Sequence, residues 1–145
     1  INFDLIFLDG FSPQRCPEIW SYEFLYQLKN KIKSQGYLIT YTSAAAVRKS
    51  LQNLGFNLYN IKPTPSKKKR WSNGTLATLD NQQNNPFITQ LSEMENEHLK
   101  TKASIPYRDP TGEMLSKEIL EIRKKEQQFS TLLDTNSWRK KWEMA

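Results

Sequence analysis

The sequence predicts an α/β fold built around a mostly parallel sheet. An unbroken apolar run at residues 3–8 is typical of a strand that is buried on both faces. Further strand-like runs alternate with segments whose apolar residues recur at helical spacing, which is the pattern of βαβ units. With 145 residues, the chain has room for about one domain.

The first segments predict a strand–helix–strand unit. Pro17 suits the first position of a helix, because the N–H group that proline lacks is not needed there. Gly36 can end this helix, and residues 37–42 read as the second strand because they are rich in aromatic and β-branched side chains. The face of the helix that packs on the sheet consists of Trp20, Phe24, Leu25, Leu28 and Ile32.

The next segments predict a second helix and then a hairpin. Ser43 can cap this helix, and Gly55 can end it. Residues 56–61 and 75–79 read as the third and fourth strands, joined by a loop rich in proline and lysine. Because no helix separates these two strands, we expect them to pair antiparallel. A mostly parallel sheet with such an ending is the C-terminal half of a class I methyltransferase Rossmann-like sheet.

The character of the sequence changes after residue 80, so we divide the chain into residues 1–80 and a mainly helical C-terminal extension, residues 81–145. Residues 80–86 read as a polar linker and residues 86–102 as weakly helical. Thr111 can cap a helix that runs to about Phe129, with an apolar stripe of Leu115, Ile119, Ile122 and Phe129. Trp138 and Trp142 share one face if their segment is helical. We expect the extension to fold onto the first part.

Composition limits the classes of function. The net charge is +6, and residues 1–79 carry eleven Lys and Arg against four Asp and Glu. A basic surface suits a polyanionic partner such as nucleic acid, although it also serves solubility. No apolar run approaches the ~20 residues that span a bilayer, so we expect no membrane partner and a cytoplasmic location. Cys16 and His98 are the only cysteine and histidine, so we expect no zinc or other metal site.

Asp9 is the strongest candidate for chemistry. It directly follows the first predicted strand, and ligands of open α/β sheets bind outside the carboxyl ends of the strands. Gly10 then lets a substrate or the backbone come close. The alternative is that Asp9 only caps the next turn. Thr42 and Ser43 end the second predicted strand on the same side of the sheet.

The block from Asp4 to Phe56 resembles the methyltransferase domain of MnmC-type tRNA-modifying enzymes. The resemblance lies in DLIFLDGFSPQRCPEIW, in GYLITYTSAAAVRKSLQNLGF and in the lysine-rich PSKKKRWSNGTLATL, which together cover about the first 79 residues. The tail, with EHLKTKASIPYRDP and TNSWRKKW, resembles the C-terminal extension of cyanobacterial members.

The resemblance implies an S-adenosylmethionine-dependent enzyme that methylates the aminomethyl group of the wobble uridine in tRNA. The expected partner is therefore the anticodon region of tRNA. Asp9 would be the catalytic residue that orients the amine and stabilises the ammonium. The residues that would bind the acceptor are Phe11, Pro13, Thr42 and Ser43. The residues that would contact RNA phosphates are Arg15, Lys67, Lys68, Lys69 and Arg70.

The sequence departs from the family pattern in one respect. The glycine-rich cofactor loop and the acidic residue after the following strand are missing, and both belong to an N-terminal half that would precede Ile1. We therefore expect a piece of a longer protein, inactive alone, whose first strand pairs with the missing half of its own domain. Two alternatives stay open: a methyltransferase with another amine acceptor, and a non-enzymatic RNA-binding or interaction fragment.

Overall fold

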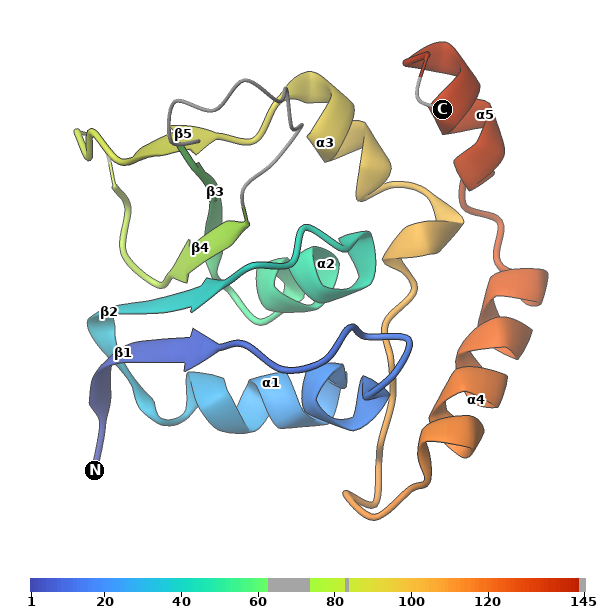
Figure 1. Ribbon diagram of the computed structural model, residues 1–145, viewed down its shortest axis with the longest axis horizontal. Coiled ribbons are helices and arrows are strands. Elements are labelled where there is room, and N and C mark those ends of the chain that lie inside the picture. Colours follow the sequence, from blue (N-terminus) through green and yellow to red (C-terminus); the bar gives the residue numbers. More distant parts are fainter. Residues whose placement is uncertain (63–73, 83, 144–145) are drawn as a thin grey trace.

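A five-stranded mixed sheet forms the centre of the computed structural model, which describes residues 1–62, 74–82 and 84–143. The strands lie in the order β1-β2-β4-β3-β5, and helices pack against the sheet, so the predicted α/β class is confirmed (Figure 1). Among the described strands only the β1–β2 pair is parallel and the other three pairs are antiparallel, so the predicted mostly parallel pairing is wrong. The strands are β1 (Phe3–Leu8), β2 (Ile32–Thr40), β3 (Asn57–Ile61), β4 (Thr75–Thr78) and β5 (Ile88–Gln90).

The predicted parallel pairing of the first two strands is confirmed. Their connection consists of η1 (Pro17–Trp20) and α1 (Tyr22–Lys29), so the predicted single helix reaching Gly36 is wrong. Ile32 instead begins β2, where it is buried and pairs with Phe3. Gly36 lies within β2 at a close approach, because a Cβ atom there would lie 3.0 Å from the main-chain oxygens of Phe3 and Asp4.

The predicted antiparallel hairpin of the third and fourth strands is also confirmed. Its second strand, β4, lies between β2 and β3 and is antiparallel to both. The helix α2 (Ala45–Asn53) connects β2 to β3. The expectation that Ser43 caps this helix is wrong: Ala44 is the N-cap residue, and its N–H donates to the Thr42 side-chain oxygen at 3.2 Å.

The C-terminal extension contains more than the predicted helices. Residues 86–102 hold the strand β5, which pairs antiparallel with β3, and the helix α3 (Glu93–His98), where the sequence predicted only weak helix. The sheet therefore continues past residue 80. A short turn, η2 (Lys102–Ser104), leads to α4 (Ser116–Phe129) and α5 (Thr135–Lys141).

The start predicted for α4 at Thr111 is wrong. Gly112 has φ of +74°, and the Asp109 side chain accepts a hydrogen bond from the Met114 N–H at 3.1 Å, so this segment forms a turn before the helix begins. Only Ile119 of the predicted apolar stripe is buried, whereas Leu115 and Phe129 are exposed.

The extension folds onto the first part of the chain, as predicted. The Tyr22 N–H donates to the Tyr107 carbonyl at 2.9 Å, and the Asp109 N–H donates to the Glu23 carboxylate at 2.7 Å. The two tryptophans of the extension both reach α3. The indole N–H of Trp138 donates to the Met94 carbonyl, and that of Trp142 donates to the Glu97 carboxylate.

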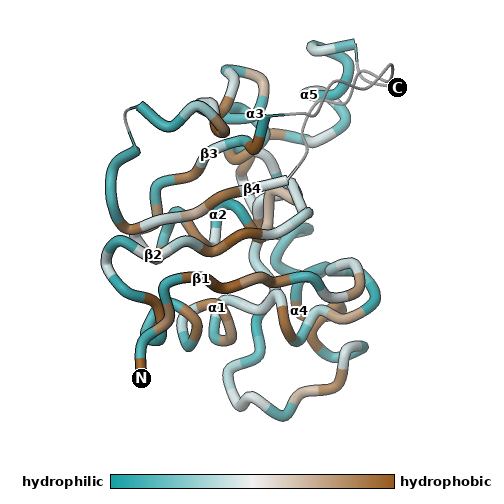
Figure 2. The backbone as a smooth tube through the Cα atoms, turned by 60° about the vertical axis from the view of Figure 1, so that its left-hand side comes forward, coloured by the Kyte–Doolittle hydropathy of each residue, from teal (hydrophilic) through white to brown (hydrophobic). Residues whose placement is uncertain are grey.

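The two faces of the sheet are covered unequally. The main core includes the buried residues of α1 and α2, whereas the opposite face carries only a small cluster of Tyr59, Leu76 and Ile88. The apolar strand β1 lies at the edge of the sheet (Figure 2). Its residues Phe3, Leu5 and Phe7 are exposed, so the expected burial of this strand on both faces is not observed. None of the helices in the described part of the chain is long and apolar enough to cross a membrane.

Candidate active site

The carboxyl ends of β1 and β2 meet at one edge of the sheet. Leu8 and Thr40 form the last pair between these strands, so Asp9 and Tyr41 leave the two strands at the same level. They border a hollow of about 250 Å³, which is lined by Phe7, Asp9, Ile39, Thr40, Tyr41 and Ile61. This position agrees with the rule that ligands of α/β sheets bind beyond the carboxyl ends of the strands.

Asp9 and Tyr41 influence each other electrostatically in this hollow. Burial, and then the negative charge of Asp9, raise the pKa of the Tyr41 hydroxyl above its usual value. The phenol therefore stays neutral over the ordinary pH range. Asp9 is exposed, and in the described part of the chain no hydrogen bond reaches its carboxylate. Its oxygens are accessible to a donor group on a ligand.

Trp20 supports both sides of the hollow. Its side chain is fully buried, which confirms the packing role predicted for it. The indole N–H donates to the Phe11 carbonyl at 2.8 Å, and the ring lies perpendicular to that of Tyr41 with 6.0 Å between the centroids. One side chain thus holds the turn after β1 against the end of β2.

The other predicted residues of the turn after β1 have different surroundings. The Phe11 side chain is 72% exposed and does not line the hollow. Pro13 is buried, and Arg15 is exposed. The turn itself is closed by the Ser12 carbonyl, which accepts hydrogen bonds from the N–H groups of Arg15 and Cys16.

Of the two predicted residues after β2, Thr42 is buried and Ser43 is partly exposed. Thr42 is buried, its hydroxyl oxygen accepts the Ala44 N–H, and its carbonyl accepts the Thr75 hydroxyl at 2.7 Å. Neither Thr42 nor Ser43 lines the hollow beside Asp9. Their assignment to the acceptor stays a prediction. Lys67, Lys68, Lys69 and Arg70 lie outside the described residues.

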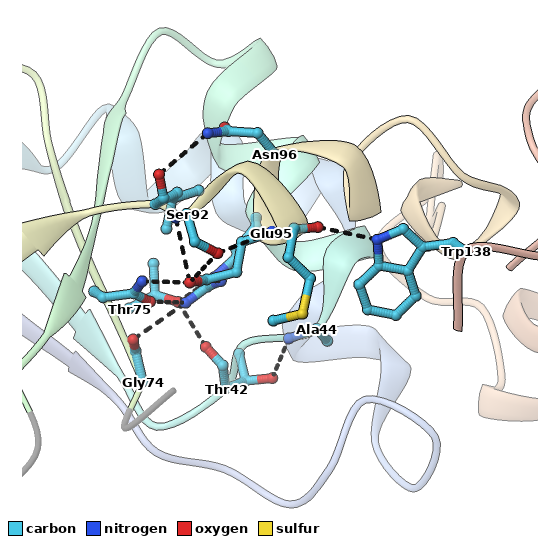
Figure 3. A network of polar contacts seen from close by, with 12 residues as sticks. Thr42, Ala44, Gly74, Thr75, Ser92, Glu95, Asn96 and Trp138 are labelled. Atoms are coloured by element: carbon cyan, nitrogen blue, oxygen red, sulfur yellow. Dashed lines mark hydrogen bonds and ion pairs between the residues drawn. The ribbon is translucent and has the colours of Figure 1, made fainter. Parts of the chain in front are cut away.

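A buried polar network lies close to this edge of the sheet, and the sequence analysis missed it. Arg48 of α2 is only 1% exposed. Its guanidinium donates to Glu95 at 2.5 Å, to the Thr75 hydroxyl at 2.8 Å and to the Asn60 side-chain oxygen at 2.8 Å. It also donates to the Gly74 carbonyl at 3.3 Å. We call Arg48, Asn60, Thr75 and Glu95 the Arg48 cluster. Figure 3 shows its members Thr75 and Glu95 with the neighbouring Gly74 and Ser92.

The Arg48 cluster joins the extension to the first part of the chain. Glu95 of α3 is 3% exposed and also accepts hydrogen bonds from the Asn60 amide at 2.6 Å and the Ser92 hydroxyl at 3.0 Å. Burial lowers the pKa of Arg48, and the Glu95 carboxylate opposes this shift. The only signal in the sequence was the spacing of Ser92 and Glu95, which is that of a helix-capping box.

The described residues hold no group of three or more His, Cys, Asp and Glu side chains arranged to bind a metal ion. The residues that line the hollow include the carboxylate residue Asp9, the phenol residue Tyr41, the hydroxyl residue Thr40 and the apolar residues Phe7, Ile39 and Ile61.

A family model described as S-adenosyl-L-methionine-dependent methyltransferase matches residues 1–77. The chain belongs to this methyltransferase family. The family uses S-adenosylmethionine, so the predicted cofactor class is confirmed. The five glycines of the chain stand singly, so the residues present do not form the glycine-rich loop expected for such a cofactor.

Similar proteins support the same family. In the crystal structure of MNMC2 from Aquifex aeolicus, the match has a TM-score of 0.77 and 30% identity and covers 88% of this chain. The bifunctional protein MnmC of tRNA 5-methylaminomethyl-2-thiouridine biosynthesis from Actinobacillus pleuropneumoniae is 42% identical over 57 residues, 39% of this chain. The predicted methyltransferase fold and MnmC-type resemblance are therefore confirmed.

The methyltransferase chain is shorter than these relatives. An uncharacterized protein from Methanocaldococcus jannaschii is 28% identical over 123 residues, which are 84% of this chain and 33% of that protein. The matches cover 39% of the Aquifex aeolicus chain and 8% of the Actinobacillus pleuropneumoniae protein.

Proposed function

We propose that this methyltransferase chain forms the acceptor side of an enzyme that N-methylates the aminomethyl group of the wobble uridine in tRNA. The observation that carries the proposal is the exposed carboxylate of Asp9 in a hollow at the carboxyl end of β1. The MnmC relatives, which act in tRNA 5-methylaminomethyl-2-thiouridine biosynthesis, suggest the substrate class. A tRNA substrate also implies that the enzyme works in the cytoplasm.

The reaction requires an amine that is neutral and correctly aligned. S-adenosylmethionine, when bound, supplies an electrophilic methyl group on its sulfonium. The Asp9 carboxylate can accept a hydrogen bond from an N–H group of the acceptor, which directs the nitrogen lone pair away from Asp9. As positive charge develops on the nitrogen, the same carboxylate stabilises the ammonium and can take up its proton.

We further propose that the free edge of β1 pairs with a strand of the cofactor-binding half of the domain. β1 has a partner on one side only among the described strands, and its exposed Phe3, Leu5 and Phe7 present an apolar surface there. An unpaired apolar edge strand is a template for pairing with another strand. Residues 1–145 alone should therefore bind the cofactor weakly and show no turnover.

The first experiment uses the full-length protein with labelled S-adenosylmethionine and tRNA that lacks the modification, followed by mass spectrometry of the nucleosides. We expect a methyl group on aminomethyluridine, and we expect Asp9→Ala and Asp9→Asn to lower kcat about 10²- to 10⁴-fold. Asp4→Asn is the matched control, because Asp4 is also an exposed carboxylate of β1 but pairs with Lys33.

Three outcomes separate the alternatives. Transfer to tRNA that depends on Asp9 supports the proposal. Cofactor binding without transfer to tRNA indicates another amine acceptor, and no cofactor binding at all indicates a non-enzymatic module.

Basic residues supply the proposed contact with RNA phosphates. Arg15 is exposed in the turn after Asp9, and residues 67–70 are all cationic. Replacing Lys67, Lys68 and Lys69 by alanine should weaken tRNA binding and flatten its salt dependence, by about 0.7 in the logarithmic slope for each lost phosphate contact. An unchanged slope would contradict this assignment.

A further inference from the structure

Tyr41 occupies a position that the sequence analysis did not assign. It follows β2 at the level where Asp9 follows β1, since Leu8 and Thr40 are the last paired residues. Phe7 and Ile39, two residues earlier on each strand, line the same hollow. Asp9 and Tyr41 both line this hollow, so the two residues border one space with apolar neighbours.

We infer, on the basis of the proposed function, that Tyr41 is the surface on which the acceptor's pyrimidine base stacks while its aminomethyl group reaches Asp9. The Tyr41 side chain is 48% exposed, so part of it is open to a ligand. A base removed from its helical stack is commonly held against an aromatic side chain. Stacking fits any planar base, so Tyr41 supplies binding and orientation and Asp9 supplies the contact to the amine.

The surroundings of Tyr41 hold its ring in place. The perpendicular contact with the fully buried Trp20 fixes one side of the ring. The backbone is fixed as well, because a Cβ atom on Gly74 would lie 3.2 Å from the Tyr41 Cα and 2.5 Å from the Thr40 oxygen. A rigid ring loses little conformational freedom when a ligand binds, which favours affinity.

Phe11 was the aromatic side chain predicted to face the uridine, and it fits this role less well. It is more exposed than Tyr41 and does not line the hollow that contains Asp9. The Tyr41 hydroxyl is neutral beside Asp9, so the ring rather than a charge is the recognition element.

The test compares Tyr41→Leu and Tyr41→Phe in the full-length protein. Tyr41→Leu should raise KM for tRNA about tenfold to hundredfold, the effect of losing one base–aromatic stack, with a smaller change in kcat. Tyr41→Phe keeps the ring and should stay close to wild type. Tyr26→Leu is the matched control, because Tyr26 of α1 is 46% exposed but does not line the hollow.

A binding cycle tests the stacking contact directly and separates it from a general loss of structure. The probes are two anticodon stem-loops, one with uridine and one with an abasic site at the wobble position. Wild type should bind the abasic probe more weakly, whereas Tyr41→Leu should bind both probes about equally. Thermal unfolding of each variant shows whether it is folded. If Tyr41→Leu does not fold, the preference of Tyr41→Phe for the uridine probe over the abasic probe still reports on stacking.

The possible results separate this inference from the function on which it rests. If wild type does not methylate tRNA, the proposed function and the role of Tyr41 both fail. If wild type methylates tRNA but Tyr41→Leu keeps its KM and its preference for the uridine probe, only the role of Tyr41 fails. A loss in Tyr41→Phe as large as in Tyr41→Leu would assign the contact to the hydroxyl and overturn stacking.

Discussion

Asp9 and Glu95 are two carboxylates in contrasting surroundings. Asp9 is exposed at the end of β1, and no described residue forms a hydrogen bond with its carboxylate. Glu95 is 3% exposed and accepts hydrogen bonds from Arg48, Asn60 and Ser92. A buried charge must be paired and hydrogen-bonded to be tolerated, whereas an exposed one need not be. The comparison assigns Glu95 to structure and leaves Asp9 available for a ligand.

The hollow beside Asp9 and the Arg48 cluster, which contains Glu95, are close neighbours in the fold. Gly74 and Thr75 connect the two: Arg48 donates to the Gly74 carbonyl and to the Thr75 hydroxyl. Gly74 packs against Thr40, which lines the hollow and pairs with Thr75. The Arg48 cluster therefore fixes the strand ends that border the hollow. α3, which carries Glu95, belongs to the extension, so the extension stabilises the candidate active site without lining it.

The largest expected effect comes from breaking the buried pair. Glu95→Ala leaves the Arg48 guanidinium buried without its carboxylate, and it should lower the free energy of unfolding by about 3–5 kcal/mol. Asp9→Ala should change it by less than about 0.5 kcal/mol, because nothing buried loses a partner. Denaturant unfolding of the full-length protein measures both changes.

Glu93→Ala is the control for this pair, since Glu93 is an exposed residue in the first turn of the same helix. The double variant Arg48→Met/Glu95→Met should lose less stability than the sum of the two single variants. Equal losses of unfolding free energy in Asp9→Ala and Glu95→Ala would mean that the exposed and the buried carboxylate contribute equally to stability.

The next effect depends on pH and tests how firmly α5 packs against α3. His98 of α3 stacks on Trp138 with 4.1 Å between ring centroids. Burial, and then the positive charges of Arg48 and Arg139, lower its pKa to about 4, while Glu95 acts in the opposite direction. Between pH 6.5 and 4 the unfolded chain binds a proton that the folded chain does not, so stability falls as the pH falls.

His98→Phe keeps an aromatic ring against Trp138 and removes the titration. From pH 6.5 to 4, wild type should lose about 1–2 kcal/mol more stability than His98→Phe, less than the full pKa shift would give because His98 is partly exposed to solvent. Urea unfolding at several pH values measures the difference, and the gap between the two proteins should be constant above pH 7. If the difference in unfolding free energy between wild type and His98→Phe stays constant down to pH 4, α5 does not bury His98.

Gly74→Ala tests the contact that joins the Arg48 cluster to the hollow beside Asp9. Gly74 has φ of +119°, and a Cβ atom there would lie 2.5 Å from the Thr40 oxygen. The substitution should lower stability by about 1–3 kcal/mol because of the strained backbone, and it should also raise KM for the acceptor. Gly55→Ala is the control, since Gly55 also has positive φ but no atom within 4 Å of the added Cβ. If Gly74→Ala and wild type have equal KM values for the acceptor, the hollow tolerates a shift of Gly74.

The smallest effect is expected from an exposed ion pair. Lys33 donates to Asp4 at 2.8 Å, but both side chains are at least half exposed. Asp4→Asn should therefore change the free energy of unfolding by less than about 0.5 kcal/mol, and less still at high salt. A loss as large as that of Glu95→Ala would mean that burial does not determine how much an ion pair contributes to the stability of this protein.

The local sequence pattern was enough to predict much of the fold. The apolar run of β1, the β-rich segments and the helix α2, which ends shortly before Gly55, each depend on neighbouring residues, so periodicity and turn residues predict them. The parallel β1–β2 pair and the antiparallel hairpin followed from the order of these elements. The position of Asp9 after a strand was readable in the same way.

Tertiary structure alone decided the rest, because those features depend on residues far apart in the sequence. Glu95 lies 47 residues from Arg48, and no local pattern marks Arg48 as buried. β5 is three residues long and exists through its pairing with β3. Tyr41, rather than Phe11, lines the hollow with Asp9, because the pairing of β1 with β2 sets which side chains meet there.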